Sequence, residues 1–206
     1  FSSNAKYIER YILVVMYFAL GGDDWLICSR KDTTCNPDED IQSWLSNTNH
    51  CLWYQVECNN DKMIHHLDFR DGATGNFRTE HAVNLVGTMP QELRHLVNLE
   101  TLVIPDMDLM APILEYLGGM QGLTRLELPQ NNFTSSIPAS FAEAHPSLTY
   151  LDLRDNSFVG RLPSNFVAFD DLTFLDLSKN KLTGPIPENF GNMSQLGTST
   201  DMCLSN

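Results

Sequence analysis

A motif of 24 or 25 residues recurs along the second half of this chain and limits the folds that it can adopt. Each copy has a Leu-x-Leu core, a polar turn and then Ile-Pro or Leu-Pro, and the clearest copies are residues 148–163 and 172–187. The spacings between equivalent leucines are 24, 25 and 24 residues, at Leu102, Leu126, Leu151 and Leu175. This period is typical of solenoids, in which each repeat supplies a strand and a turn and packs on its neighbours. The sequence therefore predicts a solenoid with one parallel β-sheet.

Five such repeats are expected within residues 63–196. The first strand lies around residues 67–69, and an insertion of about eleven residues, roughly 73–84, separates it from its turn at 85–90. That insertion is either a binding loop, because function concentrates in loops on rigid scaffolds, or a tolerated excursion.

The segments on either side of the repeats are expected to act as caps. Residues 1–62 lack the motif, and their apolar stretch at 5–20 predicts a buried helix that ends at Gly21-Gly22, since glycine tolerates the left-handed conformation that closes helices. A cap is needed because the end of a solenoid exposes a strand edge and an open core. Residues 197–206 lack the spaced leucines of a sixth strand and are expected to begin a carboxy-terminal cap.

Charge and hydropathy exclude two classes of partner. The 206 residues include 13 basic and 26 acidic ones, a net charge of −13, which repels nucleic acid and anionic lipid. The longest apolar run, residues 11–20, is about half the length that crosses a bilayer, and it lacks the basic start of a signal peptide. We therefore expect that residues 1–206 do not contact a membrane, and we leave open a membrane anchor beyond the chain end.

Four cysteines in the amino-terminal region form two pairs, each separated by seven positions: Cys28, Cys35, Cys51 and Cys58. Four cysteines allow three pairings, of which we favour Cys28–Cys35 and Cys51–Cys58, with free buried thiols as the alternative. Their clustering in an acidic chain favours an oxidising compartment, and therefore an extracellular or cell-surface location.

Two features resemble plant-type extracellular leucine-rich-repeat proteins. The first is a Gly-x-Ile/Leu-Pro element at residues 87–90, 160–163 and 184–187, with a near copy at 135–138. The second is residues 51–58, Cys-Leu-Trp-Tyr-Gln-Val-Glu-Cys, which resembles the Cys-x-Trp-x-Gly-Val-x-Cys signature of that family, with Gln55 in place of glycine. Residues 11–25 look more like algal relatives.

The resemblance implies an α/β fold: a right-handed solenoid with a concave parallel sheet, 3₁₀ or loop segments on the convex side and a helical, disulfide-bonded amino-terminal cap. It also implies binding rather than catalysis. Family members often close the last repeat with a disulfide, so the partner of Cys203 is expected beyond Asn206; the alternative is a free or intermolecular thiol.

Asparagines recur at two kinds of position. Asn131, Asn156 and Asn180 follow successive strands at matching places and are expected to form a structural ladder, each amide pairing with buried backbone groups. Gly72 and Met107 stand at that place in the first two repeats, where we expect irregular turns. Two further asparagines lie in sequons for N-glycosylation, Asn132 and Asn192.

The candidate binding residues lie on the outer side of the strands, because neighbouring side chains on a strand point to opposite faces. They are Arg125, Glu127, Tyr150, Asp152, Arg154, Phe174 and Asp176. Glu127, Asp152 and Asp176 form a ladder of negative charges. Like charges on adjacent strands are destabilising unless other groups neutralise them. Either Arg125 and Arg154 neutralise this ladder internally, or the carboxylates hold a cationic or hydroxyl-rich ligand beside an aromatic platform.

Catalysis and metal binding are not predicted. The chain has no nucleophile elbow, phosphate loop or HExxH motif, and an open sheet encloses no substrate for paired acids. The histidines at 65, 66, 81 and 95 fit the periodic pattern, so we expect no metal site and no cofactor.

The predicted function is extracellular recognition. We expect the ectodomain or co-receptor-like part of a cell-surface protein that binds a protein, peptide or glycan. The alternative is a secreted inhibitor of cell-wall-degrading enzymes, or an adhesion protein without a membrane anchor.

Overall fold

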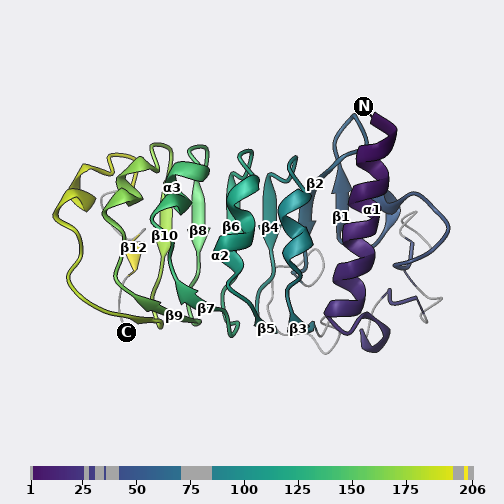
Figure 1. Cartoon of the computed structure of the whole chain (residues 1–206), viewed down its shortest axis with the longest axis horizontal. Helices are drawn as coiled ribbons and strands as arrows, with labels where there is room; N and C mark the ends of the chain where they lie inside the picture. Colours follow the sequence, from purple (N-terminus) through teal and green to yellow (C-terminus); the bar gives the residue numbers. More distant parts are fainter. Residues whose placement is uncertain are drawn as a thin grey trace.

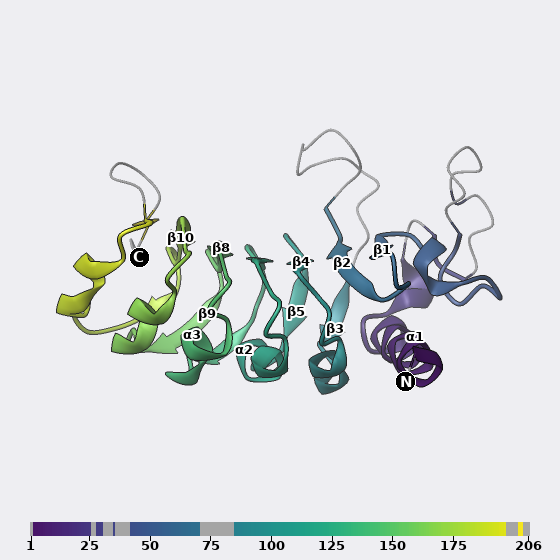
Figure 2. The ribbon, with the colours of Figure 1, turned by 90° about the horizontal axis from the view of Figure 1, so that it is seen from above.

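A computed structural model of the chain describes residues 2–25, 28–30, 35, 42–70, 85–196 and 202–203. The repeats follow one another along the long axis of the molecule, from helix α1 (Ser2–Ala19) at one end to strand β12 (Met202–Cys203) at the other (Figure 1). Viewed from above, the short helices lie on the side opposite strands β8 and β10 (Figure 2). The expected solenoid, with a strand face and a helical face, is therefore what the chain forms.

A seven-stranded sheet forms the concave face, in the order β1-β2-β4-β6-β8-β10-β12. Its central strands are parallel, and each is one repeat further along the chain: β2 (Ile64–Asp68), β4 (Thr101–Val103), β6 (Arg125–Glu127), β8 (Tyr150–Asp152) and β10 (Phe174–Asp176). The register places the strand leucines in one row, and all five are fully buried: Leu67, Leu102, Leu126, Leu151 and Leu175.

Both ends of this sheet differ from the sequence-based expectation. β1 (Val56–Cys58), within the cap, pairs antiparallel with β2 and covers the edge of the first repeat. At the other end we expected no further strand after Leu196, but β12 pairs in parallel with β10. In the backbone pairing Met202 stands opposite Leu175, 27 residues earlier in the chain. The role of residues 197–206 as the start of a cap stays a prediction.

Short strands and helices complete each repeat outside the concave face. The strands form two further parallel groups: β3 (Val86–Thr88) with β5 (Asp108–Met110), and β7 (Thr134–Ser136) with β9 (Ser157–Gly160) and β11 (Lys181–Leu182). The convex-side helices are η3 (Gln91–His95), α2 (Ile113–Tyr116), η4 (Leu117–Gly119), α3 (Ser140–Ala144), η5 (Ser164–Ala168) and η6 (Glu188–Asn192).

The proline of the Gly-x-Ile/Leu-Pro element precedes three of the 3₁₀ helices on the convex side. Pro90, Pro163 and Pro187 are the residues immediately before η3, η5 and η6, with φ angles of −76°, −67° and −57°. Proline suits this place because its ring fixes φ near these values and it has no N–H to leave unpaired. The repeated element thus directs the chain from the short strands β3, β9 and β11 into the helices of the convex face.

An asparagine ladder holds the turns after the strands. Asn156 Nδ2 donates to the carbonyls of Leu128 (2.7 Å) and Leu153 (3.1 Å), and its Oδ1 accepts the Phe133 N–H (3.1 Å). Asn180 repeats this pattern one turn along, with the Leu153 carbonyl at 2.9 Å. The amide therefore joins each repeat to the one before it.

The ladder changes character at the amino-terminal repeats. Asn131 Nδ2 donates to the Ile104 carbonyl at 2.8 Å, but its buried Oδ1 accepts no hydrogen bond among the described residues. At the equivalent place in the preceding repeat, the Met107 sulfur accepts the Leu85 N–H at 3.4 Å. The expected irregularity at Met107 thus takes the form of a weak sulfur acceptor. Gly72, like the insertion at 73–84, lies outside the described residues.

Helix α1 packs against the first repeat and closes the core. It buries Ile12, Leu13, Met16 and Tyr17, and two residues after its end Gly21 has the left-handed φ of 71° that was expected to close it. The short helix η1 (Gly22–Asp24) follows. None of the described helices is long and apolar enough to cross a membrane.

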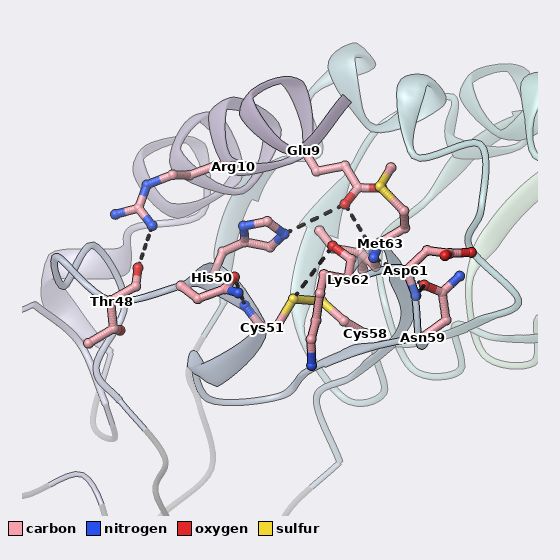
Figure 3. The surroundings of a disulfide bond; sticks show 12 residues. Glu9, Arg10, Thr48, His50, Cys51, Cys58, Asn59, Asp61, Lys62 and Met63 are labelled. Carbon is pink, nitrogen blue, oxygen red and sulfur yellow. Dashed lines mark hydrogen bonds and ion pairs between the residues drawn. A yellow bond between two sulfur atoms is a disulfide. The ribbon is translucent and has the colours of Figure 1, made fainter. Parts of the chain in front are cut away.

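Disulfides and hydrogen bonds to α1 hold the cysteine-containing part of the cap in place. The structure has the favoured pairing, Cys28–Cys35 and Cys51–Cys58. Arg10 donates to the carbonyls of Thr48 (2.6 Å) and Ser46 (2.7 Å), next to the short helix η2 (His50–Leu52). Figure 3 shows Glu9 and His50 facing each other beside the second disulfide.

Candidate functional site

The seven predicted binding residues lie together on the concave face of β6, β8 and β10 and the turn after β8. Backbone pairing sets Arg125 beside Tyr150 and Tyr150 beside Phe174, and in the next row it sets Glu127 beside Asp152 and Asp152 beside Asp176. We call these residues, together with Asp68 and Arg70 of the first repeat, the concave patch. The alternation of faces along each strand, from which the sequence analysis selected these residues, is consistent with this register.

A continuous stack of three side chains runs across the patch. The Arg125 guanidinium lies 3.9 Å from the centre of the Tyr150 ring, and the Tyr150 and Phe174 rings are 4.1 Å apart and nearly parallel, at 4°. A guanidinium over an aromatic face is attracted by the ring electrons and contributes about 0.5–2 kcal/mol, depending on desolvation. The stack is therefore ordered before any ligand arrives.

The carboxylate row beside the stack is buried and internally paired. Glu127, Asp152 and Asp176 are 6%, 2% and 7% exposed. Asp152 Oδ1 accepts the Arg154 N–H at 3.0 Å, and Asp176 Oδ1 accepts the Ser178 N–H at 2.9 Å. These bonds to backbone donors explain how acids of one sign can line neighbouring strands.

Arginines supply the remaining compensation. Arg125 forms an ion pair with Glu127, and Arg154 Nη1 lies 3.5 Å from Asp152 Oδ2. Arg70, which the sequence analysis did not select, pairs with Asp68 and reaches to 3.7 Å from Glu127. A signal for Arg70 was present, because Asp68-Phe-Arg70 repeats the Asp-x-Arg pattern of Asp152-Leu-Arg154. Arg125 and Arg154 are thus paired with carboxylates of the row, as in the first of the two alternatives that the sequence analysis gave.

Burial changes the acidity of this patch. It raises the pKa of Asp152 from 3.8 to about 6, against the lowering effect of the Arg154 N–H and guanidinium. The neighbouring acids Asp176 and Glu127 raise it further. Burial is also the main reason why the pKa of Tyr150 is raised, followed by the charges of Glu127 and Asp152.

The predicted glycosylation residues are accessible. Asn132 and Asn192 are exposed, and Asn132 Oδ1 accepts a hydrogen bond from the Ser157 hydroxyl at 3.3 Å. Their use as glycosylation sites stays a prediction.

Comparison with known proteins finds leucine-rich repeats in the carboxy-terminal half of the chain. The family model described as Leucine Rich Repeat matches residues 147–169 and 171–193, the two clearest copies of the motif. A curated protein from Arabidopsis thaliana, the probable LRR receptor-like serine/threonine-protein kinase RPK1, is 27% identical over 128 residues, which are 56% of this chain and 24% of that protein. The chain thus spans about a quarter of the length of this relative.

Solved plant structures share the fold. The ectodomain of the receptor kinase SOBIR1 from Arabidopsis thaliana is 20% identical with a TM-score of 0.68, over 96% of this chain and 91% of that one. The ectodomain of the Arabidopsis receptor kinase HAESA, solved with an IDA peptide hormone ligand, is 24% identical with a TM-score of 0.68, over 93% of this chain and 28% of that one. Both similarities concern the fold.

Proposed function

We propose that this chain, a plant-type extracellular leucine-rich-repeat protein, is a recognition module that binds a protein or peptide partner on its concave patch. The Arg125–Tyr150–Phe174 stack carries this proposal. Aromatic and arginine side chains are the usual anchors of protein interfaces, because they offer large contact areas at low entropic cost. Here three of them are held in one row on a rigid sheet.

The charge of the patch indicates the chemistry of the partner. Four carboxylates, at residues 68, 127, 152 and 176, face three guanidinium groups, at 70, 125 and 154, in a chain of net charge −13. A basic partner is therefore favoured through the long-range field of these charges rather than by direct contact with the buried carboxylates, and an apolar or aromatic side chain of the partner would lie on the rings of Tyr150 and Phe174. The HAESA ectodomain, solved with a peptide hormone, lends support to a peptide ligand.

The setting of this module is proposed to be a cell-surface ectodomain or co-receptor. A short array offers a small sheet, which suits completing a complex with other proteins. The alternative is a secreted inhibitor or adhesion protein. Reading the open reading frame downstream of Asn206 separates them: a transmembrane segment supports the first, and a stop codon supports the second.

A catalytic role is not proposed. Asp152 and Glu127 are 2% and 6% exposed and already bonded within the protein, so substrate atoms have little access to them. Incubating the protein with a panel of polysaccharides tests this point. Hydrolysis that Glu127→Gln abolishes would contradict the proposal.

A binding screen tests the recognition proposal. The immobilised chain is presented with a displayed library of secreted peptides, an array of extracellular proteins and an array of cell-wall glycans. Binders are then retested on the double variant Tyr150→Ala/Asp152→Ala and on Tyr11→Ala, a control in which an exposed tyrosine on α1 is removed.

We expect peptide or protein binders that the double variant loses and the control retains. Binders limited to glycans would contradict the proposed partner class, and binders indifferent to the double variant would contradict the proposed surface.

A further inference from the structure

Two histidines and two glutamates meet at the amino-terminal edge of the concave sheet. His65 Nδ1 lies 3.7 Å from Glu100 Oε2, and His66 Nδ1 lies 3.6 Å from Glu57 Oε2. The two imidazole rings are 4.3 Å apart. Potential ligand atoms of His65, His66 and Glu100 all lie within 4.8 Å of one another. The sequence analysis expected no metal site at these histidines, but from this geometry we infer a binding site for a divalent transition metal ion, Zn²⁺ or an ion of similar preference.

The backbone brings these four residues together from three neighbouring segments. Glu57 in β1 is the direct partner of His66 in the antiparallel β1–β2 ladder. Glu100, immediately before β4, donates its N–H to the His65 carbonyl at 2.8 Å. Side chains mounted on paired strands are positioned more accurately than those on loops. The site is therefore largely assembled by the fold.

The distances suit closure around an ion. Tetrahedral Zn²⁺ has bonds of about 2.0–2.2 Å to nitrogen and oxygen, so neighbouring ligand atoms stand about 3.3–3.5 Å apart. The side chains of His65, His66 and Glu100 are 24%, 36% and 52% exposed. They therefore have room to rotate until their ligand atoms reach this separation. Glu57 is not one of these mutually close residues, but its carboxylate lies 3.6 Å from His66 Nδ1 and its side chain is 71% exposed, so a rotation of that side chain would supply the fourth position.

The ligand set also selects the ion. Imidazole nitrogens favour zinc, copper and nickel over magnesium and calcium, which prefer oxygen ligands. With neutral histidines, the two glutamates balance the charge of a divalent cation. The bound ion would link β1, in the cap, with β2 and the start of β4, and it would therefore stabilise the junction between cap and repeats.

The same four residues can pair differently without a metal, as protonated histidines with glutamates. This alternative gives no response to added Zn²⁺, so titration separates the two. The experiment uses protein without a histidine tag at pH 7.5, with isothermal titration by ZnCl₂ and thermal unfolding with and without the ion. Circular dichroism confirms that each variant is folded.

Matched variants assign the binding to the site. His65→Ala/His66→Ala removes both imidazoles, and Glu100→Gln removes one carboxylate while keeping its shape. His95→Ala is the control, because His95 is exposed in η3 and contacts Arg94.

We expect one Zn²⁺ per chain and a raised unfolding temperature for the wild type and His95→Ala. The double variant and Glu100→Gln should bind Zn²⁺ at least about tenfold more weakly. Even substitutions of residues that only hydrogen-bond to metal ligands commonly reduce metal affinity by this factor. No Zn²⁺ binding by the wild type, or equal binding by the double variant, would overturn the inference.

Discussion

At the scale of single residues, Asp152 shows how burial weakens the acidity of a carboxylate. It is 2% exposed between Glu127 and Asp176, and its pKa is raised to about 6. The native protein therefore retains this proton at pH values where the unfolded chain has lost it. Stability from this group is greatest at low pH and falls as the pH rises from about 4 to about 6.

Asp152→Asn should remove this dependence on pH. Asparagine keeps an oxygen for the Arg154 N–H but carries no charge to bury. We expect the variant to gain stability relative to the wild type between pH 4 and pH 7, by about 1–3 kcal/mol, because each pKa unit corresponds to about 1.4 kcal/mol. Urea unfolding of both proteins at the two pH values measures this difference. An equal stability difference at pH 4 and pH 7 would contradict it.

Sequence reasoning selected seven of the nine residues of the concave patch, without Asp68 and Arg70, and did not specify all of their contacts. The alternation of a strand and the 24-residue period fix which side chains share a face, so Tyr150 and Phe174 were placed side by side correctly. The reach of Arg70 from the first repeat to Glu127 in the third was not predictable. It depends on the rotamers of long side chains, which no periodic pattern specifies.

At the scale of the repeat, the asparagine ladder predicts unequal roles for residues of one type. Asn156 satisfies the buried Phe133 N–H, whereas the Oδ1 of Asn131 accepts no hydrogen bond within the described chain. Asn156→Ala should therefore cost more stability than Asn131→Ala, by about 1–3 kcal/mol, the usual cost of an orphaned buried donor. Chemical denaturation of the two variants supplies the comparison. Equal losses would show that the acceptor role of the side chain is unimportant.

The cap helix offers a second prediction at the scale of an element. Glu9 in α1 is 2% exposed, and its Oε2 accepts the Ile64 N–H of β2 at 2.9 Å, while His50 Nε2 lies 3.6 Å from the same oxygen (Figure 3). Glu9→Ala leaves that N–H unpaired and should destabilise the protein by about 1–3 kcal/mol. Glu9→Gln, which keeps an acceptor, should cost less. Hydrogen exchange at the Ile64 amide should accelerate in the alanine variant, and an unchanged rate would argue against this contact.

The elements themselves were partly predictable. Helix α1 was predicted from an apolar run before two glycines, and the cysteine spacing favoured the observed disulfides without excluding the other two pairings. β1 and β12 were missed because neither carries the Leu-x-Leu signal. Each forms because an open sheet edge offers unpaired backbone groups, so pairing there depends on the neighbouring strand more than on the added sequence.

At the scale of the whole molecule, the solenoid separates its buried core from the surface that we propose for recognition. Leucines and phenylalanines fill the interior, and the concave face carries a preassembled row of arginine and aromatic side chains. The inferred metal site lies on the same sheet, towards the cap. The acidic net charge of −13 acts over the whole surface and favours basic partners from a distance.

The most direct test of the central claim is the equilibrium affinity for a peptide or protein partner from the screen. It is measured for the wild type, for Tyr150→Ala/Phe174→Ala and for the control Tyr11→Ala. Loss of interface anchors typically costs about 2 kcal/mol or more, so the dissociation constant of the double variant should rise at least about thirtyfold while that of the control stays unchanged. An unchanged dissociation constant for a folded double variant would contradict recognition by the concave patch.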